Sequence, residues 1–372
     1  MRILDRYILS QILLTTLAAT GVLTFLVVVP NAFRRVFEHL VNSDIPLLTI
    51  LQMVLLLVPQ ALTLTIPWGF LMAILMVMGR MSHDLELQAV RSSGLGLVPL
   101  VSPVILLSLG LSLLCLYNNA MLAPRCITAF KLMLVDMGRK NPTMLLRAQE
   151  PITAFPGFRI YVDKKYGQTV EGVAIWILDD EGLPKSSVRA ERGTISADLN
   201  AMVLTLTLFN ARQENRGEDP TQLDKIQTGM RAGQFPITVS LKKFLDTSNV
   251  TAKISNLTFG QLTNRIFEPG GDKVEQMVPL LTEFQKRLSL SVSCFTFALM
   301  AIPLAVYTQR RETSISFALS LGLIIVYYLI LNGADALRHK ASAYPDVVIW
   351  LPNVIFQLTG FCLLWKANRH PM

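Results

Sequence analysis

The chain has 372 residues, of which 52% are hydrophobic and 16% are charged, and its formal net charge is +8. Charged side chains are costly inside a bilayer, so their near absence from long stretches of the chain is what membrane-spanning helices require. The positive charge does not indicate nucleic-acid binding, because the basic residues form no dense run with interleaved aromatics. Many of them lie at the ends of apolar runs, where they meet lipid headgroups.

Six uncharged apolar runs form two groups of three, separated by a polar block. An α-helix rises about 1.5 Å per residue and needs roughly 20 apolar residues to cross a bilayer core, and each run meets or approaches that length. We therefore predict six transmembrane helices, over residues 7–33, 45–79, 92–124, 288–309, 313–334 and 347–365. This layout excludes a soluble enzyme that has only a membrane-anchoring tail. It predicts two membrane bundles with a domain between them, at residues 1–124, 125–286 and 287–372.

The first apolar run does not have the pattern of a cleaved signal peptide. Arg2 and Arg6 precede it, but its apolar residues continue to Val29. The hydrophobic region of a signal peptide spans about 7–15 residues, so we expect an uncleaved first helix.

Two arginines, Arg34 and Arg35, follow this first run, and Arg34 stands four residues before Glu38. The sequence alone favours a surface ion pair between Arg34 and Glu38. The alternative is an anion site, because guanidinium groups bind phosphates well.

The loop between the second and third runs has the pattern of a short helix over residues 82–94. Ser82 suits the N-cap and Gly94 suits the C-terminal stop, and the acidic residues near the start suit the positive end of the helix dipole. Two interpretations remain open. The helix covers the inner ends of the spans at the membrane interface, or it docks into a cytoplasmic partner with Glu86 as a buried polar contact.

Alternation of apolar and polar residues replaces the apolar runs between residues 158 and 255. A period of two predicts strands, and the strongest candidate is rich in β-branched and apolar residues. The expected strands cover residues 158–163, 173–178, 189–196, 201–209 and 234–239. We predict an all-β, antiparallel, sandwich or jellyroll-like domain. An amphipathic helix over residues 127–138 precedes it, and helices over residues 258–265 and 273–289 follow it.

The sequence lacks motifs for catalysis, for metal binding and for nucleotide binding. It contains no G-x-S-x-G, no H-E-x-x-H and no P-loop, and its four cysteines have no ligand-like spacing. We therefore expect no catalytic residue, no metal and no cofactor, and ATP-driven transport would need a separate ATPase subunit. Cysteines 115, 294 and 362 have the pattern of apolar core residues, and Cys126 has no assigned role. The spans lack charges away from their ends, which disfavours an ion-coupled carrier.

The distribution of basic residues predicts the orientation. Six spans place both termini on one side, and the short segments on that side carry more Lys and Arg than those on the other. Positively charged short segments stay in the cytoplasm, so we predict cytoplasmic termini and an exported central domain.

The motifs of both membrane halves together resemble the LptF/LptG (YjgP/YjgQ) permeases, which extract lipopolysaccharide from the inner membrane of Gram-negative bacteria. The residues that carry the resemblance are Gly79-Arg80, Glu86 to Gly94, Pro103, Asn119, Ala123-Pro124, Glu283, Arg287, Ala301 to Leu304, Tyr327-Tyr328, Trp350 to Asn353, Phe356 and Gly360. The central domain resembles the family by position and strand pattern only. Where this chain has Ser92-Ser93, the family usually has small residues of which the first is Ala. The two serines are also small, so the volume is kept.

This resemblance implies a non-catalytic permease subunit of an ATP-binding-cassette exporter, with six spans and a periplasmic β-jellyroll domain. The implied partners are lipopolysaccharide, a second permease of the same family, a dimeric cytoplasmic ATPase of the LptB type, and periplasmic bridge proteins of the LptC and LptA types. The implied location is the bacterial inner membrane, with both termini cytoplasmic and the central domain periplasmic.

The resemblance also implies roles for particular residues. The helix over residues 82–94 becomes a coupling helix, and its predicted contacts with the ATPase are Asp84, Leu85, Glu86, Leu87, Ala89, Arg91 and Gly94. Spans one and five would line a lipid cavity, and the predicted lipid-binding residues are Arg34, Arg35, Phe25, Phe317 and Tyr327. The two arginines match positions where basic residues meet lipopolysaccharide phosphates, so the resemblance favours the anion site over the surface ion pair.

Two other classes of function are consistent with the layout. One is a membrane-anchored envelope scaffold whose β-domain binds partner proteins without moving lipid. The other is an integral membrane enzyme that modifies lipid, which the missing catalytic cluster disfavours.

Overall fold

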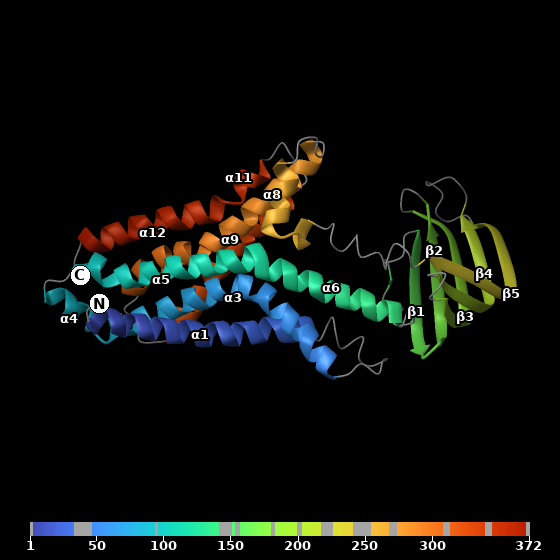
Figure 1. Cartoon of the computed structure of the whole chain (residues 1–372), viewed down its shortest axis with the longest axis horizontal. Coiled ribbons are helices and arrows are strands. Elements are labelled where there is room, and N and C mark those ends of the chain that lie inside the picture. The colour runs from blue at the N-terminus through green and yellow to red at the C-terminus, as the bar shows by residue number, and fades with distance from the viewer. Residues whose placement is uncertain are drawn as a thin grey trace. The chain divides into compact units, whose positions relative to one another are not determined.

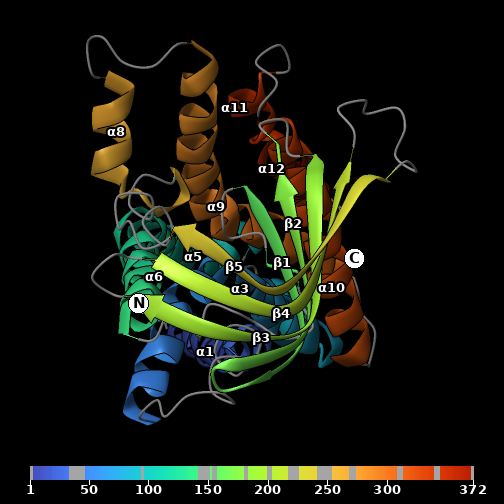
Figure 2. The same ribbon diagram turned by 90° about the vertical axis from the view of Figure 1, so that its right-hand side faces the viewer.

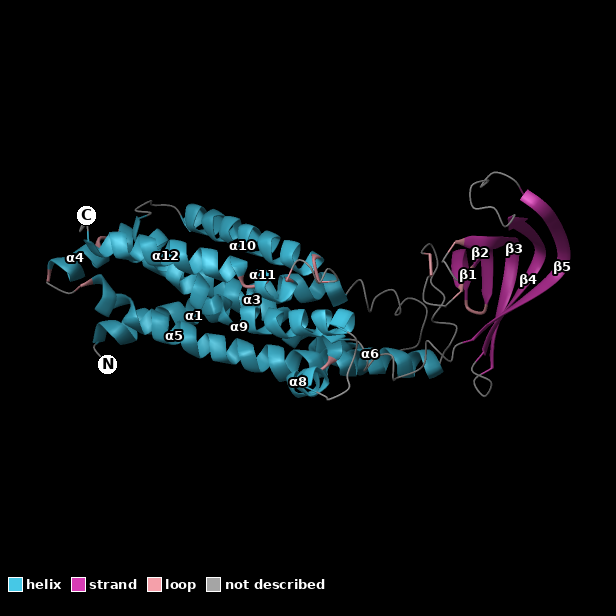
Figure 3. Ribbon diagram, turned by 90° about the horizontal axis from the view of Figure 1, so that it is seen from above, coloured by secondary structure: helices cyan, strands magenta, loops and turns pink. Residues whose placement is uncertain are grey.

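The computed structural model describes residues 3–32, 47–93, 96–140, 151–152, 157–179, 183–198, 203–216, 226–240, 254–267, 274–307, 313–338 and 344–369. The chain divides into two compact units. The first contains residues 1–31, 54–127 and 253–372, and the second contains residues 32–53 and 128–252. Helices make up the first unit, and all the described strands belong to the second (Figure 3).

Six helices among the described residues are long and apolar enough to cross a membrane, as the apolar runs predict. They are α1 (Ile3–Ala32), α3 (Leu47–His83), α5 (Leu97–Tyr117), α9 (Val274–Tyr307), α10 (Thr313–Ala336) and α12 (Leu351–Arg369) (Figure 1). Helix α5 continues through a π-helical turn, η2 (Asn118–Leu122), into α6 (Ala123–Lys140). The short elements are α4 (Glu86–Ser92), η4 (Ile254–Asn256), α8 (Phe259–Phe267) and α11 (Pro345–Val348).

The six helices differ in how deeply they are buried. In their most apolar stretches, 67% of the residues of α3 and 72% of those of α9 are buried, against 17% for α1 and 22% for α10. Helices α3 and α9 therefore form the centre of the unit, and α1 and α10 lie at its periphery.

Glycines permit close helix contacts, which matter in a bilayer because packing rather than water exclusion holds helices together. A Cβ at Gly69 of α3 would lie 2.4 Å from the Thr20 hydroxyl of α1. A Cβ at Gly360 of α12 would lie 2.6 Å from the carbonyl oxygen of Leu299 in α9. Either added methyl group would force the two helices apart.

A polar cluster inside the first unit joins α9, α10 and α12. Asn353 accepts hydrogen bonds from Thr296 (2.7 Å) and Tyr327 (3.0 Å), and its amide donates to the hydroxyl and the carbonyl of Ser289 (2.8 and 2.9 Å). Buried polar groups are costly unless they are paired, and here each of these groups has a partner. The cluster fixes the relative register of the three helices.

The described residues of the second unit form one antiparallel sheet whose five strands lie in chain order. They are β1 (Phe158–Tyr166), β2 (Thr169–Leu178), β3 (Pro184–Asp198), β4 (Val203–Arg216) and β5 (Ile226–Ser240), and Figure 2 shows β3 to β5 bending along their length. One face is apolar and buried, with Ile160, Val188 and Leu206 fully covered and Val135 of α6 packed against it.

This structure confirms the expected all-β, antiparallel central domain, and each predicted strand falls within or overlaps an observed one. The observed strands are longer. The helices expected before and after the sheet are α6 and α8, and the one expected over residues 273–289 is the first half of α9.

Candidate functional site

The short helix α4 lies at the same end of the first unit as the start of α1 and the end of α12 (Figure 1). Helix α3 ends at His83, and the chain turns through Leu85, which has a positive φ of 61°, into α4. The expected helix over residues 82–94 is therefore shorter than predicted, because its first residues belong to the end of α3. The amide of Ala89 donates to the Leu85 carbonyl at 2.9 Å, which closes the first turn of α4.

One side of α4 packs on the first unit and another faces outward. Leu87 is 3% exposed and belongs to the main hydrophobic core. Leu85 is 57% exposed, Asp84 and Ala89 are exposed, and Glu86 is half-buried. The helix therefore has one buried apolar anchor and a mixed apolar and acidic outer surface. Gly94 lies outside the described residues, as does the side chain of Arg91.

Ser82 does not cap α4. Its hydroxyl, at the end of α3, donates to the carbonyl of Val306 in α9 at 3.3 Å. Nearby, the guanidinium of Arg80 donates to the side-chain oxygen of Gln11 in α1. The segment that leads into α4 is thus bonded to α1, a peripheral helix, and to α9, a central one.

The predicted lipid-binding residues occupy different environments. Phe25 of α1 and Phe317 of α10 are 66% and 50% exposed. Arg34 and Arg35 lie outside the described residues. Tyr327 is fully buried, with its ring against Phe297 at a centroid distance of 4.8 Å. Phe25 and Phe317 are therefore accessible from outside the first unit, whereas Tyr327 belongs to the polar cluster around Asn353.

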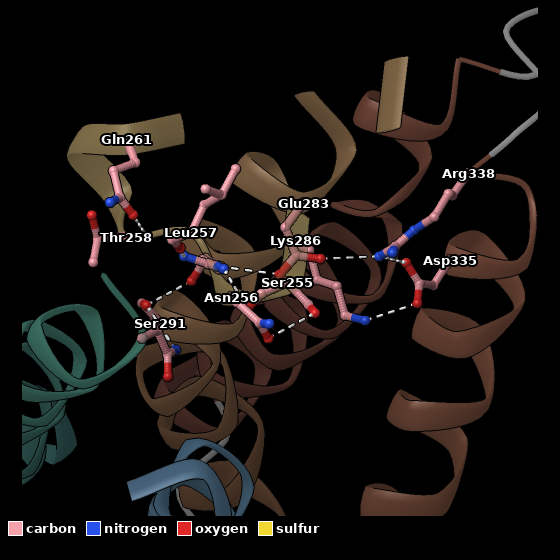
Figure 4. A network of polar contacts seen from close by, with 12 residues as sticks. Ser255, Asn256, Leu257, Thr258, Gln261, Glu283, Lys286, Ser291, Asp335 and Arg338 are labelled. Atoms are coloured by element: carbon pink, nitrogen blue, oxygen red, sulfur yellow. Dashed lines mark hydrogen bonds and ion pairs between the residues drawn. The ribbon is translucent and has the colours of Figure 1, made fainter. Parts of the chain in front are cut away.

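A charged network joins α9, α10 and the segment that re-enters the first unit after the sheet (Figure 4). Glu283 of α9 accepts hydrogen bonds from Arg287 at 3.2 Å and from Arg338 at 3.0 Å. Asp335 of α10 accepts from Arg338 at 2.7 Å and from Lys286 at 2.8 Å. The five side chains alternate in charge, so each carboxylate bridges two cations.

Arg287 connects this network to the re-entering segment. Its guanidinium donates to the carbonyls of Leu257 (2.7 Å) and Ser255 (3.1 Å). The side chains of Arg287 and Glu283 are only 8% and 11% exposed. Charges buried this deeply are costly unless they are paired, and Arg338 supplies a second partner for Glu283. The network therefore fixes η4 and Leu257, which precedes α8, against α9.

The sequence contained two local signals for this network. Asp335 and Arg338 are three residues apart, a spacing at which ion pairs form on a helix. Glu283 and Arg287 are four residues apart, the spacing of an ion pair on one helix face. Their bonds to Arg338, Ser255 and Leu257 come from distant parts of the chain, and no local pattern predicts them. Within the described residues, no group of three or more His, Cys, Asp or Glu side chains is placed to hold a metal ion.

Comparison with known proteins assigns the family. Residues 6–366 match the family model described as lipopolysaccharide export system permease LptF/LptG. The chain is similar to the lipopolysaccharide export system permease protein LptF of Escherichia coli strain K12, with 21% identity over 98% of this chain and 95% of the relative. The proteins of the same name from Escherichia coli O157:H7 and from Shigella flexneri match with the same identity and coverage. Since the family model covers nearly the whole sequence, the chain belongs to the LptF/LptG family of lipopolysaccharide export system permeases.

Proposed function

We propose that this chain is a non-catalytic subunit of an ATP-driven exporter that extracts lipopolysaccharide from the bacterial inner membrane. The sequence has no P-loop, so a separate dimeric ATPase of the LptB type hydrolyses ATP. A second permease of the same family completes the membrane part, and periplasmic bridge proteins of the LptC and LptA types receive the lipid. The similar proteins named above are LptF proteins, which favours the F-type subunit over the G-type.

The position of α4 carries this proposal. The ATPase binds the outward surface of α4, where Leu85 and Ala89 are exposed and Glu86 is half-buried. Its motion reaches the spans through two routes, the buried anchor Leu87 and the bond from Ser82 to α9. The termini and α4 are cytoplasmic in this arrangement, and the sheet is periplasmic.

The lipid would enter beside α1 and α10. These are the spans with the smallest buried fractions, and they carry the exposed Phe25 and Phe317. The second permease and the lipid cover these apolar surfaces in the complex. Tyr327 supports this region from the core, and Arg34 and Arg35 meet the lipid phosphates.

Reconstitution tests the proposal. The chain, its partner permease and the ATPase are placed in vesicles with lipopolysaccharide, and ATP-dependent release to a bridge protein is measured. Glu86→Ala is expected to reduce co-purification of the ATPase and to reduce release. Glu171→Ala, which removes a 40% exposed carboxylate on β2, is the matched control and should leave both unchanged. Full binding and release in the Glu86→Ala variant would contradict the assigned role of α4.

A further inference from the structure

Three arginines lie in one row across the sheet of the second unit. Arg189 of β3 is opposite Arg212 of β4, and Arg212 is opposite Arg231 of β5. Strands lie about 4.8 Å apart, so the row extends over about 10 Å. Like charges directly opposite each other destabilise a sheet, so a row of three needs a compensating interaction.

These side chains occupy the face of the sheet opposite the hydrophobic core. Val188 and Ala190, on either side of Arg189, are 0% and 8% exposed, and successive residues of a strand point to opposite faces. Ala211 is likewise buried beside Arg212. All three arginines are exposed. Within the described part of the chain none of them forms an ion pair, whereas Arg192 of β3 lies 3.7 Å from Glu171.

The arginine row (Arg189, Arg212 and Arg231) lines a hollow of about 940 Å³. Ala174 of β2 lies opposite Arg189, and Tyr161 of β1 lies opposite Ala174. Tyr161 is therefore in the same row across the sheet. Trp176, Glu191 and Glu214 also line this hollow. Small-molecule sites have volumes of about 300–1,000 Å³ and combine aromatic walls with a few convergent polar groups, as this hollow does.

The chemistry of these residues selects a class of ligand. Guanidinium groups bind phosphate oxygens with paired hydrogen bonds, and three of them supply more positive charge than the two carboxylates cancel. Ionised carboxylates are acceptors only, so Glu191 and Glu214 favour a ligand that also has hydroxyl groups. The half-buried rings of Tyr161 and Trp176 offer flat apolar surfaces for the faces of a sugar ring.

We infer that this hollow is a binding site for a phosphorylated sugar. The phosphate lies on the arginine row, the hydroxyl groups donate to Glu191 and Glu214, and the sugar ring packs against Tyr161 and Trp176. Such a group has two sources, the phosphorylated headgroup of a glycolipid or a free sugar phosphate. The lipid source rests on the proposed function, and the site itself does not.

Binding of glucose 1-phosphate to the full chain in phosphatidylcholine nanodiscs tests the site, measured from the broadening of the ligand's phosphorus NMR signal. Arg212→Gln, at the centre of the row, is expected to raise the Kd at least tenfold. Arg189→Gln is a second variant with the same expectation. Arg192→Gln removes an equal charge from the same strand outside the hollow and should leave the Kd unchanged. Absence of binding by the unaltered chain, or equal weakening by Arg192→Gln, would overturn the inference.

A photoreactive phenylalanine in place of Ala174 distinguishes the two sources. In the reconstituted exporter, a lipopolysaccharide adduct that glucose 1-phosphate suppresses identifies the lipid headgroup as the ligand. Glucose 1-phosphate binding without an adduct identifies a free sugar phosphate. An adduct that persists unchanged with Arg212→Gln would contradict the site. Lipid release is measured in the same samples, so failure of this site with normal release leaves the export proposal intact.

Discussion

Truncation of Leu87, the buried anchor of α4, tests whether α4 transmits motion of the ATPase to the membrane-spanning helices. Leu87→Ala removes a side chain that is 3% exposed, and a buried Leu→Ala change costs about 2–5 kcal/mol. Helix α4 has only seven residues, and isolated helices of that length are marginal in water, so its docking depends on this packing. A loss of about 2 kcal/mol raises the undocked population about 30-fold.

Hydrogen exchange of the chain without its partners measures this effect. Leu87→Ala should speed exchange of the α4 amides, including that of Ala89, by about 30-fold or more. Leu85→Ala is the matched control, because Leu85 is 57% exposed and its loss removes much less packing. In the reconstituted exporter, Leu87→Ala should retain ATP hydrolysis and lose lipid release, whereas Leu85→Ala should weaken ATPase binding. Equal exchange rates in the two variants would refute the anchoring role of Leu87.

Three further substitutions are expected to lower the thermal stability of the detergent-solubilised chain. Gly360→Ala places a Cβ 2.6 Å from the carbonyl of Leu299, and overpacking of this kind costs about 1–3 kcal/mol, whereas Gly322→Ala meets nothing within 4 Å and should leave Tm unchanged. Arg287→Ala removes one of the two cations that Glu283 binds and the donor to the carbonyls of Leu257 and Ser255, which should cost about 1–3 kcal/mol; a Tm equal to that of the unaltered chain would show that the charged network is not structural. Asn353→Leu removes the acceptor of the buried Tyr327 hydroxyl, at about 1–3 kcal/mol, and an unchanged Tm would contradict the role of the polar cluster.

Local hydrophobic patterns predicted the helices and strands because each of them keeps one hydrophobic pattern along its length. The apolar runs predict the six long helices, and the period of two predicts the strands. The prediction for β4 ended at residue 209, whereas the strand continues to Arg216. Asn210 has a positive φ of 52°, and the buried positions change from Leu208 to Ala211 there, three residues apart. Buried and exposed positions therefore stop alternating regularly at Asn210. For this reason the sequence pattern does not reveal the part of β4 that follows it.

The ends of α4 show a second limit of sequence patterns. Ser82 has the residue type of an N-cap, but the chain turns at Leu85 and the helix begins at Glu86. The hydroxyl of Ser82 is bonded instead to Val306, which is 224 residues away. A tertiary hydrogen bond therefore replaces the local cap that the pattern predicted.

Long-range contacts account for the features that the sequence did not predict. The charged network needs Ser255, Arg287 and Arg338 to meet, and the arginine row needs the register of three strands. Single charged residues in these segments have the pattern of a solvated surface. Only the folded chain shows that some are buried and that others line one hollow.

Cross-linking from the membrane-facing surface tests the central claim, that this chain moves lipopolysaccharide, most directly. Photoreactive phenylalanine replaces Phe25 of α1 or Phe317 of α10, and Phe361 of α12 is the matched control, since these side chains are 66%, 50% and 62% exposed. The account predicts lipopolysaccharide adducts at Phe25 and Phe317 that ATP diminishes, and none at Phe361. Absence of adducts at Phe25 and Phe317, with normal binding of envelope proteins to the sheet, would contradict export and favour a scaffold.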